Sequence, residues 1–494
     1  MLSLDLINEL FDRWERVWNH GELDLVASCV APRYLRHEDT GDRVVSPEEY
    51  VAEIEKLRQE RPDLQIVAYD HAIQGDRAWY RVDFRWTDEV TGKAQTRASI
   101  QIWRIEDGKF AEAWIASLPI GSTWGDAVAQ ESWTNRNVRQ SATKKLFTRF
   151  QLGKLDLRNR IVMAPMTRSR AIGNLPNDLM SEYYAARADA GLIITEGTSP
   201  SPNGLGQPRI PGLFNVEQIA AWCSVTDAVH KNGGKIFVQL MHTGRVAHPV
   251  NLPAGSKMLA PSAAAIQGDI WTDANGHQPY PVPSEMTDAE IENAIGEFVQ
   301  AARYALEAGF DGVELNAANG YLIEQFLNPN VNRRSDAWGG NRRAAFALET
   351  ARRTVEAIGG DRVGVRISPY GVINDTGPFE GIDEFYGELA SQLSDLGLIY
   401  VHVVDHSSMG APAVSADLKQ KIRSSFRGAY ILSGGYDASR AEQELKQVKG
   451  DLVAFGRPFV ANPDLVERLR TGAPLHEPDP NTFYTPGPEG YTTL

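Results

Sequence analysis

The chain has 494 residues, which is room for about three average domains, or for a large barrel with one smaller domain. Its 50 basic and 64 acidic residues give a net charge of −14, which argues against a nucleic-acid partner because such proteins need a basic surface. Only two cysteines are present, and neither belongs to a CxxC pair, so no disulfide framework, zinc site or iron–sulfur cluster is expected. The chain lacks an apolar run of about 18 residues and a basic, apolar leader, which predicts a cytoplasmic protein without a membrane span.

The first 121 residues predict an α+β domain. Apolar residues at helical spacing predict helices over 4–18 and 47–59, the second entered through Ser46 and Pro47. An Asp-Gly pair at 107–108 fits a tight turn between two strands. The alternating runs that predict strands of an antiparallel meander are 64–70, 77–88, 95–106 and 109–117. Helices followed by such a meander describe one curved sheet wrapped on helices.

The pattern changes near residue 130. Segment 122–142 has little periodicity and predicts a linker. From residue 143 to residue 494, short apolar runs alternate with long amphipathic ones, such as 217–231, 288–308, 383–396 and 438–448. Eight such units in one segment predict a (β/α)8 barrel with a parallel sheet buried on both faces. The strands are expected at 160–166, 191–197, 235–242, 312–317, 363–368, 399–405, 429–434 and 452–457.

The ends of the last two predicted strands are rich in glycine. Gly434 and Gly435 follow one strand, and Gly456 and Arg457 follow the next. Bare backbone amides and a guanidinium at this place are typical of a barrel phosphate site. A tight turn and a surface ion pair are the alternative. Because both features occur at adjacent strand ends, the pattern favours the phosphate site.

Polar residues at the other strand ends suit a flat heteroaromatic ring. Thr167 can donate a hydroxyl, Gln239 can donate and accept, and Arg366 can place positive charge beside a reducible ring. The alternatives are a buried amide that satisfies backbone groups for Gln239 and an ion pair in the barrel core for Arg366.

The end of the fourth barrel strand carries Asn316 and Asn319, followed by Tyr321. The two amides can converge on one carbonyl oxygen, and the phenol can supply a proton. An ordinary turn at Asn-Gly-Tyr is the alternative.

The segments around these residues resemble the old yellow enzyme family of flavin-dependent ene-reductases over roughly residues 143–494. The matching segments are 160–168, 238–245, 310–327, 332–340, 365–369, 455–463 and 482–484. The resemblance implies FMN as cofactor and NADH or NADPH as its reductant. The residues that it assigns to FMN are Pro165, Met166, Thr167, Gly197, Gln239, Arg366, Gly434, Gly435, Gly456 and Arg457.

The same resemblance implies the chemistry. Reduced FMN would give hydride to the β-carbon of an activated alkene such as an enone or enal, and Tyr321 would protonate the α-carbon. Asn316 and Asn319 would anchor the electron-withdrawing group, and Met241 and Tyr484 would line the substrate pocket. Asn316 departs from the histidine that is often found at its position, and Met241 departs from a common aromatic residue.

The N-terminal segment resembles the SnoaL-like and ketosteroid-isomerase-like cone fold, on residues 34–39, 47–50 and 102–114. A carboxylate in the pocket of such a cone can act as a base. The candidates are His37, Glu38 and Asp39, for which a solvated charged turn is the favoured alternative. We expect an accessory domain that forms a homodimer or holds a ligand. The alternative is a bifunctional fusion in which this domain isomerises or cyclises the substrate or product of the reductase.

Overall fold

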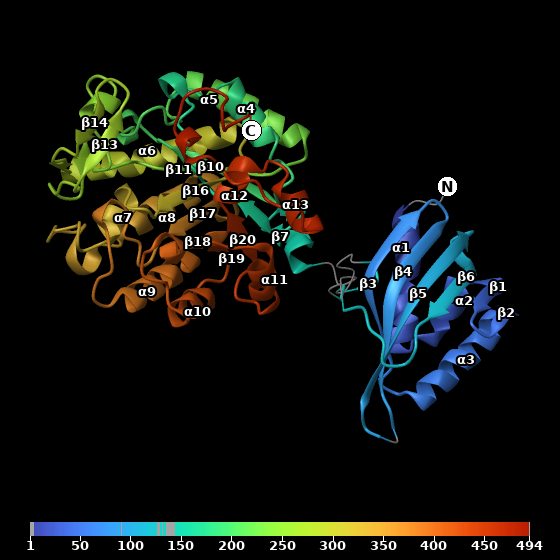
Figure 1. Cartoon of the computed structure of the whole chain (residues 1–494). Coiled ribbons are helices and arrows are strands. Elements are labelled where there is room, and N and C mark those ends of the chain that lie inside the picture. Colours follow the sequence, from blue (N-terminus) through green and yellow to red (C-terminus); the bar gives the residue numbers. More distant parts are fainter. Residues whose placement is uncertain (1–3, 90, 126–128, 131, 135–143, 494) are drawn as a thin grey trace. The chain divides into compact units, whose positions relative to one another are not determined.

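A computed structural model of the chain describes residues 4–89, 91–125, 129–130, 132–134 and 144–493 (Figure 1). The chain divides into two compact units, residues 1–142 and 143–494. Among the described residues, no helix combines the length and the apolar character needed to cross a membrane.

The N-terminal unit contains a six-stranded sheet in the order β2-β1-β6-β5-β4-β3, with helices packed against it (Figure 1). The predicted helices and meander are confirmed, and the turn at Asp107 and Gly108 has φ values of 50° and 75°, as a tight hairpin requires. The predicted elements are α1 (Leu4–His20), α3 (Pro47–Glu60), β3 (Gln65–Gln74), β4 (Arg77–Thr87), β5 (Ala94–Glu106) and β6 (Lys109–Ser117).

The sequence pattern did not predict the short helix α2 (Val26–Cys29) or the strands β1 (Val30–Glu38) and β2 (Gly41–Val45). Strand β1 pairs in parallel with β6 and antiparallel with β2. Its charged side chains hide the alternation expected of a strand, because they form ion pairs along the sheet instead of facing water freely. The interpretation as a solvated turn is therefore wrong for His37 and Glu38, which belong to β1, whereas Asp39 lies in the turn that follows the strand.

Part of the segment expected to be a linker packs against the N-terminal unit. The Trp133 side chain is buried, and its indole N–H donates to the carbonyl of Ile66 at 2.9 Å. The indole N–H of Trp124 donates to the carbonyl of Val82 at 3.1 Å. Single aromatic residues anchor this segment, and they leave no periodic pattern in the sequence. Residues 126–128, 131 and 135–142 lie outside the described residues.

The C-terminal unit is a closed barrel of eight parallel strands, which confirms the predicted fold (Figure 1). The strands are β9 (Ile161–Met163), β10 (Leu192–Thr198), β11 (Ile236–Leu240), β16 (Gly312–Ala317), β17 (Val363–Ile367), β18 (Tyr400–Val404), β19 (Ala429–Ser433) and β20 (Leu452–Phe455). Short strands outside the barrel are β7 (Phe150–Leu152), β8 (Leu155–Leu157), β12 (Leu259–Ala260), β13 (Asp269–Thr272), β14 (Gly276–Pro279) and β15 (Ser284–Glu285).

Helices follow the barrel strands. They are α4 (Asp178–Ala185), α5 (Val216–Lys231), α6 (Asp288–Glu307), α7 (Leu322–Leu327), α8 (Ala345–Ile358), α9 (Ile382–Asp395), α10 (Ala416–Ser425), α11 (Ala438–Lys446), α12 (Arg457–Ala461) and α13 (Leu465–Thr471). Helix α6 begins with a capping box between Thr287 and Glu290, which satisfies backbone amides of its first turn.

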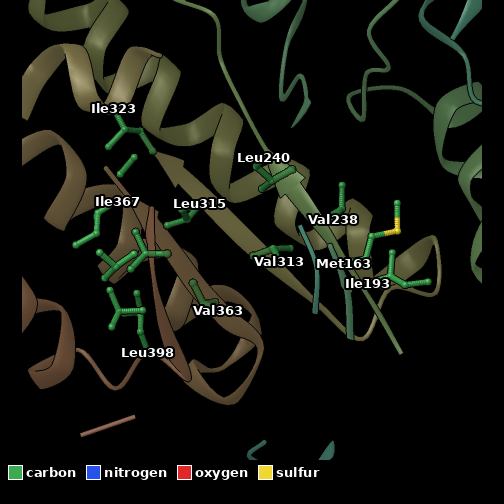
Figure 2. Packing of buried hydrophobic residues seen from close by; sticks show 14 of the residues in the cluster. Met163, Ile193, Val238, Leu240, Val313, Leu315, Ile323, Val363, Ile367 and Leu398 are labelled. Atoms are coloured by element: carbon green, nitrogen blue, oxygen red, sulfur yellow. The ribbon is translucent and has the colours of Figure 1, made fainter. Parts of the chain in front are cut away.

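Alternation along each barrel strand separates two environments. Outward residues such as Val313 and Leu315 pack between the strands and the helices (Figure 2). A separate apolar cluster joins strand residues such as Phe237 and Ile431 to the β7–β8 hairpin. Gly153 of that hairpin lies against Ile399, so the hairpin sits near the N-terminal ends of the strands. The opposite end of the barrel interior is left for polar side chains.

Candidate active site

Polar side chains fill the C-terminal end of the barrel interior because strand register brings them together. Gln239 of β11 pairs with Glu314 of β16. On the next strand Arg366 pairs with Asn316 on one side and with His402 of β18 on the other. All five side chains are buried. Three predicted residues, Gln239, Asn316 and Arg366, are thus placed in one cluster.

Hydrogen bonds order this cluster. The Asn316 amide donates to Gln239 Oε1 at 3.0 Å, and Gln239 Nε2 donates to Glu314 Oε1 at 2.7 Å. The other oxygen of Glu314 lies 2.9 Å from His402 Nδ1. Burial opposes ionisation of Glu314, but His402, Arg366 and the hydrogen bonds outweigh it and lower its pKa. Sequence reasoning missed Glu314, although a charged residue inside an apolar strand run was a usable signal.

Arg366 keeps donor capacity for a ligand. Only 8% of the residue is exposed, yet its Nε has no hydrogen-bond partner among the described residues. A buried guanidinium with an unpaired N–H is costly unless a polar group meets it. This donor fits an electron-rich ring edge, such as that of a flavin.

The glycine-rich end of the barrel has open backbone. Gly434 and Gly435 have φ values of 135° and 61°, which strongly favour glycine. A Cβ on Gly456 would meet nothing closer than Met166 Sδ at 3.6 Å, so its surroundings are open. Arg457 is exposed at the start of α12 and forms no ion pair within the described part of the chain. The alternative of a surface ion pair is therefore not seen there, and these features suit a phosphate group.

The first two strands supply the remaining predicted cofactor residues. Pro165 is buried, and Met166 and Thr167 are half-buried in the segment after β9. Gly197 is buried in β10, where an added Cβ would lie 2.4 Å from the Met241 sulfur. A predicted cofactor residue and a predicted pocket residue are therefore in contact.

Tyr321 stands before the first turn of α7 and packs against an apolar cluster that includes Met241. Its hydroxyl accepts a hydrogen bond from Gln207 Nε2 at 3.2 Å. Burial raises the pKa of Tyr321 to about 12, so the phenol stays protonated at neutral pH. Gln207 was not predicted, because a loop far away in sequence brings it there.

Asn319 has a left-handed backbone, with φ of 59°. Its side-chain Oδ1 is buried without a hydrogen-bond partner in the described structure, so this oxygen can accept a hydrogen bond from a ligand. In contrast, the Asn316 side-chain amide already donates a hydrogen bond to Gln239. The two asparagines are therefore not equivalent.

The C-terminal segment holds Tyr484, which is 59% exposed. Arg209 donates to the Tyr484 carbonyl at 2.7 Å. Arg168 and Arg170 are buried and donate to further carbonyls of the segment, including that of Phe483. Backbone contacts fix the segment and leave the Tyr484 ring mostly free.

A cavity of about 320 Å³ lies in the N-terminal unit. Its lining includes Trp14, Trp103 and Glu38, but not His37. His37 stacks on Trp114 with 5.1 Å between ring centroids, and it bonds to Glu112 and Asp42. Glu38 is paired with Arg36 and Arg43, which neutralise its charge.

Comparison with known proteins agrees with both units. A family model described as NADH:flavin oxidoreductase / NADH oxidase family matches residues 145–476, and one described as SnoaL-like polyketide cyclase matches residues 8–117. A chanoclavine-I aldehyde reductase from Penicillium roqueforti is 43% identical over 365 residues, which cover 70% of this chain and 95% of that protein. The 12-oxophytodienoate reductase 7 of Oryza sativa subsp. japonica is 40% identical over 367 residues, which cover 70% and 93%. A structure of morphinone reductase is 41% identical, with a TM-score of 0.68, over 70% of this chain and 95% of that one.

The barrel and these matches define a flavin-dependent oxidoreductase. The chain belongs to the NADH:flavin oxidoreductase / NADH oxidase family, known as the old yellow enzyme family, and carries a SnoaL-like domain before the barrel. It is an FMN enzyme that NAD(P)H reduces. Both family resemblances seen in the sequence are confirmed.

Proposed function

We propose that the barrel is an ene-reductase in which Tyr321 protonates the α-carbon of an activated alkene, such as an enone or enal. When bound, FMN supplies to the β-carbon the hydride that it receives from NAD(P)H. The proposal is carried by the Tyr321 hydroxyl, whose pKa of about 12 keeps it protonated and which accepts a hydrogen bond from the neutral side-chain amide of Gln207. Asn319 and Asn316 would bind the carbonyl oxygen and stabilise the negative charge that develops on it.

The cofactor would lie across the C-terminal end of the barrel. Arg366 would meet the ring where charge develops on reduction, and Gln239 would bond the ring edge. The residues proposed to hold FMN are Pro165, Met166, Thr167, Gly197, Gln239, Arg366, Gly434, Gly435, Gly456 and Arg457. Met241 and Tyr484 would border the alkene.

This assignment is tested by measuring the FMN content and the redox behaviour of the purified protein. We expect one FMN per chain, and we expect the yellow absorbance to bleach when NADH or NADPH is added without oxygen. A protein that stays colourless after incubation with FMN would contradict the proposed function.

For the N-terminal domain we propose an accessory role, with dimerisation through the outer face of its sheet. Trp79 and Ile102 face each other on β4 and β5, and they are 41% and 36% exposed. Exposed apolar side chains gathered on one sheet face are typical of an interaction surface. The cavity also favours a ligand-holding role. A base role for Glu38 is disfavoured, because Arg36 and Arg43 neutralise it.

Charge placed on this face should separate the subunits. We expect Ile102→Arg to convert a dimer to a monomer in sedimentation velocity, because a buried unpaired charge is costly. Val216→Arg, at a 71% exposed position on the barrel, is the matched control and should leave the dimer intact. A monomeric wild-type protein would contradict the dimer. Location in the cytoplasm stays a prediction from the sequence.

A further inference from the structure

We propose that Glu324 is a positioning residue: together with Ser368 it holds the loop that presents Asn319 and Tyr321 to the substrate. The proposal rests on the ene-reductase function proposed above. Glu324 touches neither cofactor nor alkene in it, and acts only through the loop.

Two successive backbone amides of the loop donate hydrogen bonds to the side chains of Glu324 and Ser368. The Gly320 N–H donates to Glu324 Oε2 at 2.5 Å. The Asn319 N–H donates to Ser368 Oγ at 2.9 Å. Ser368 Oγ in turn donates to the carboxylate, with distances of 3.0 and 3.1 Å to its two oxygens. The buried Glu324 carboxylate therefore holds both amides, that of Gly320 directly and that of Asn319 through Ser368.

The loop needs such support because its backbone is unusual. Asn319 has φ of 59° and Gly320 has φ of 73°, so two consecutive residues are left-handed. This conformation is unfavourable for a residue with a side chain. The carboxylate offsets that cost, since hydrogen bonds to a charged acceptor are stronger than those to a neutral one.

Glu324 has no cationic partner among the described residues, and it is 1% exposed. The groups that face it are Gly320 of its own loop, Ser368 after β17, and the hydroxyl of Tyr386 on α9. Burial raises the pKa of Glu324 to about 7, although these donors lower it. Tyr386 itself does not ionise near neutral pH, because burial raises its pKa well above the usual value.

The direction of the pH effect follows from the protonation state of Glu324 that holds the loop more firmly. Above pH 7 Glu324 is ionised and accepts its hydrogen bonds with full strength. Below pH 7 it is protonated, the bonds weaken, and the loop loosens. Buried histidines near the site cannot produce this step, because burial lowers the pKa of His242 to about 3 and of His406 to about 4.

The experiment follows the binding of 2-cyclohexenone to the FMN-loaded, pre-reduced full-length enzyme by stopped flow, at pH values on both sides of 7. We expect the apparent dissociation constant of the wild type to rise about tenfold as the pH falls through this value. Glu324→Gln should remove the pH step and bind at the weaker, low-pH level throughout. Ser368→Ala, which keeps the carboxylate but loses the link to Asn319, should weaken binding at every pH.

The matched control is Glu196→Gln. Glu196 is a second buried carboxylate whose pKa burial raises to about 7, but it bonds to Tyr184 and the Arg168 amide and not to the loop. This variant should keep the pH step. If Glu324→Gln keeps the step, or Ser368→Ala binds like the wild type, the proposal is wrong while the ene-reductase function stands. A protein that binds FMN but reduces no alkene would instead remove the proposed function.

Discussion

Replacing Tyr321 by phenylalanine should slow alkene reduction about 100-fold, since a positioned general acid contributes at least this much. Reduction of the flavin by NAD(P)H should change by less than about threefold, because no proton passes from the phenol in that step. The two half-reactions can be measured separately by stopped flow. Because the pKa of Tyr321 is about 12, the phenol of the wild type should remain able to donate its proton to the alkene across the neutral pH range.

Tyr280→Phe is the matched control, because Tyr280 is a second phenol near enough to Tyr321 to affect its ionisation. This control should reduce alkenes at close to the wild-type rate. Equal slowing of both half-reactions in Tyr321→Phe would show that the phenol positions the ligands and does not donate the proton.

Replacing Arg366 by methionine should weaken FMN binding by about 100-fold, because a charged hydrogen-bond donor is lost from a buried site. The measurement is the quenching of FMN fluorescence on titration with deflavinated protein. The loss of Arg366 also removes one of the groups that stabilise the buried Glu314 carboxylate, so the variant alone should be less stable.

Two further variants separate binding from folding. In Arg366→Met combined with Glu314→Gln the uncompensated charge is removed, so stability should recover while FMN binding stays weak. Arg362→Met changes an exposed arginine just before the same strand, β17, and should bind FMN normally. Normal FMN binding by Arg366→Met would contradict the role given to this residue.

The sequence pattern was sufficient to predict the barrel, because buried parallel strands appear in a sequence as short apolar runs. All eight barrel strands were predicted in this way. The same reasoning failed at β1, where Arg36 and Glu38 form an ion pair along the sheet. It also missed Trp133, because a single anchoring side chain has no period.

Residues of the candidate site could be predicted where they lie near the C-terminal ends of barrel strands, as Gln239, Asn316 and Arg366 do. The partners that orient these residues were not predicted. Glu314 and His402 lie on strands β16 and β18, which are not neighbours, and they meet inside the barrel, while Gln207 reaches Tyr321 from a loop 114 residues away. Such contacts depend on how the barrel closes, which local sequence does not encode.

The most direct test of the central claim is anaerobic reoxidation of the NADPH- or NADH-reduced enzyme by 2-cyclohexenone. We predict that the flavin absorbance returns in a saturable step, with one cyclohexanone formed per flavin. A reduced enzyme that is reoxidised by oxygen but not by this alkene, or by other enones and enals, would contradict the assignment of the barrel as an ene-reductase.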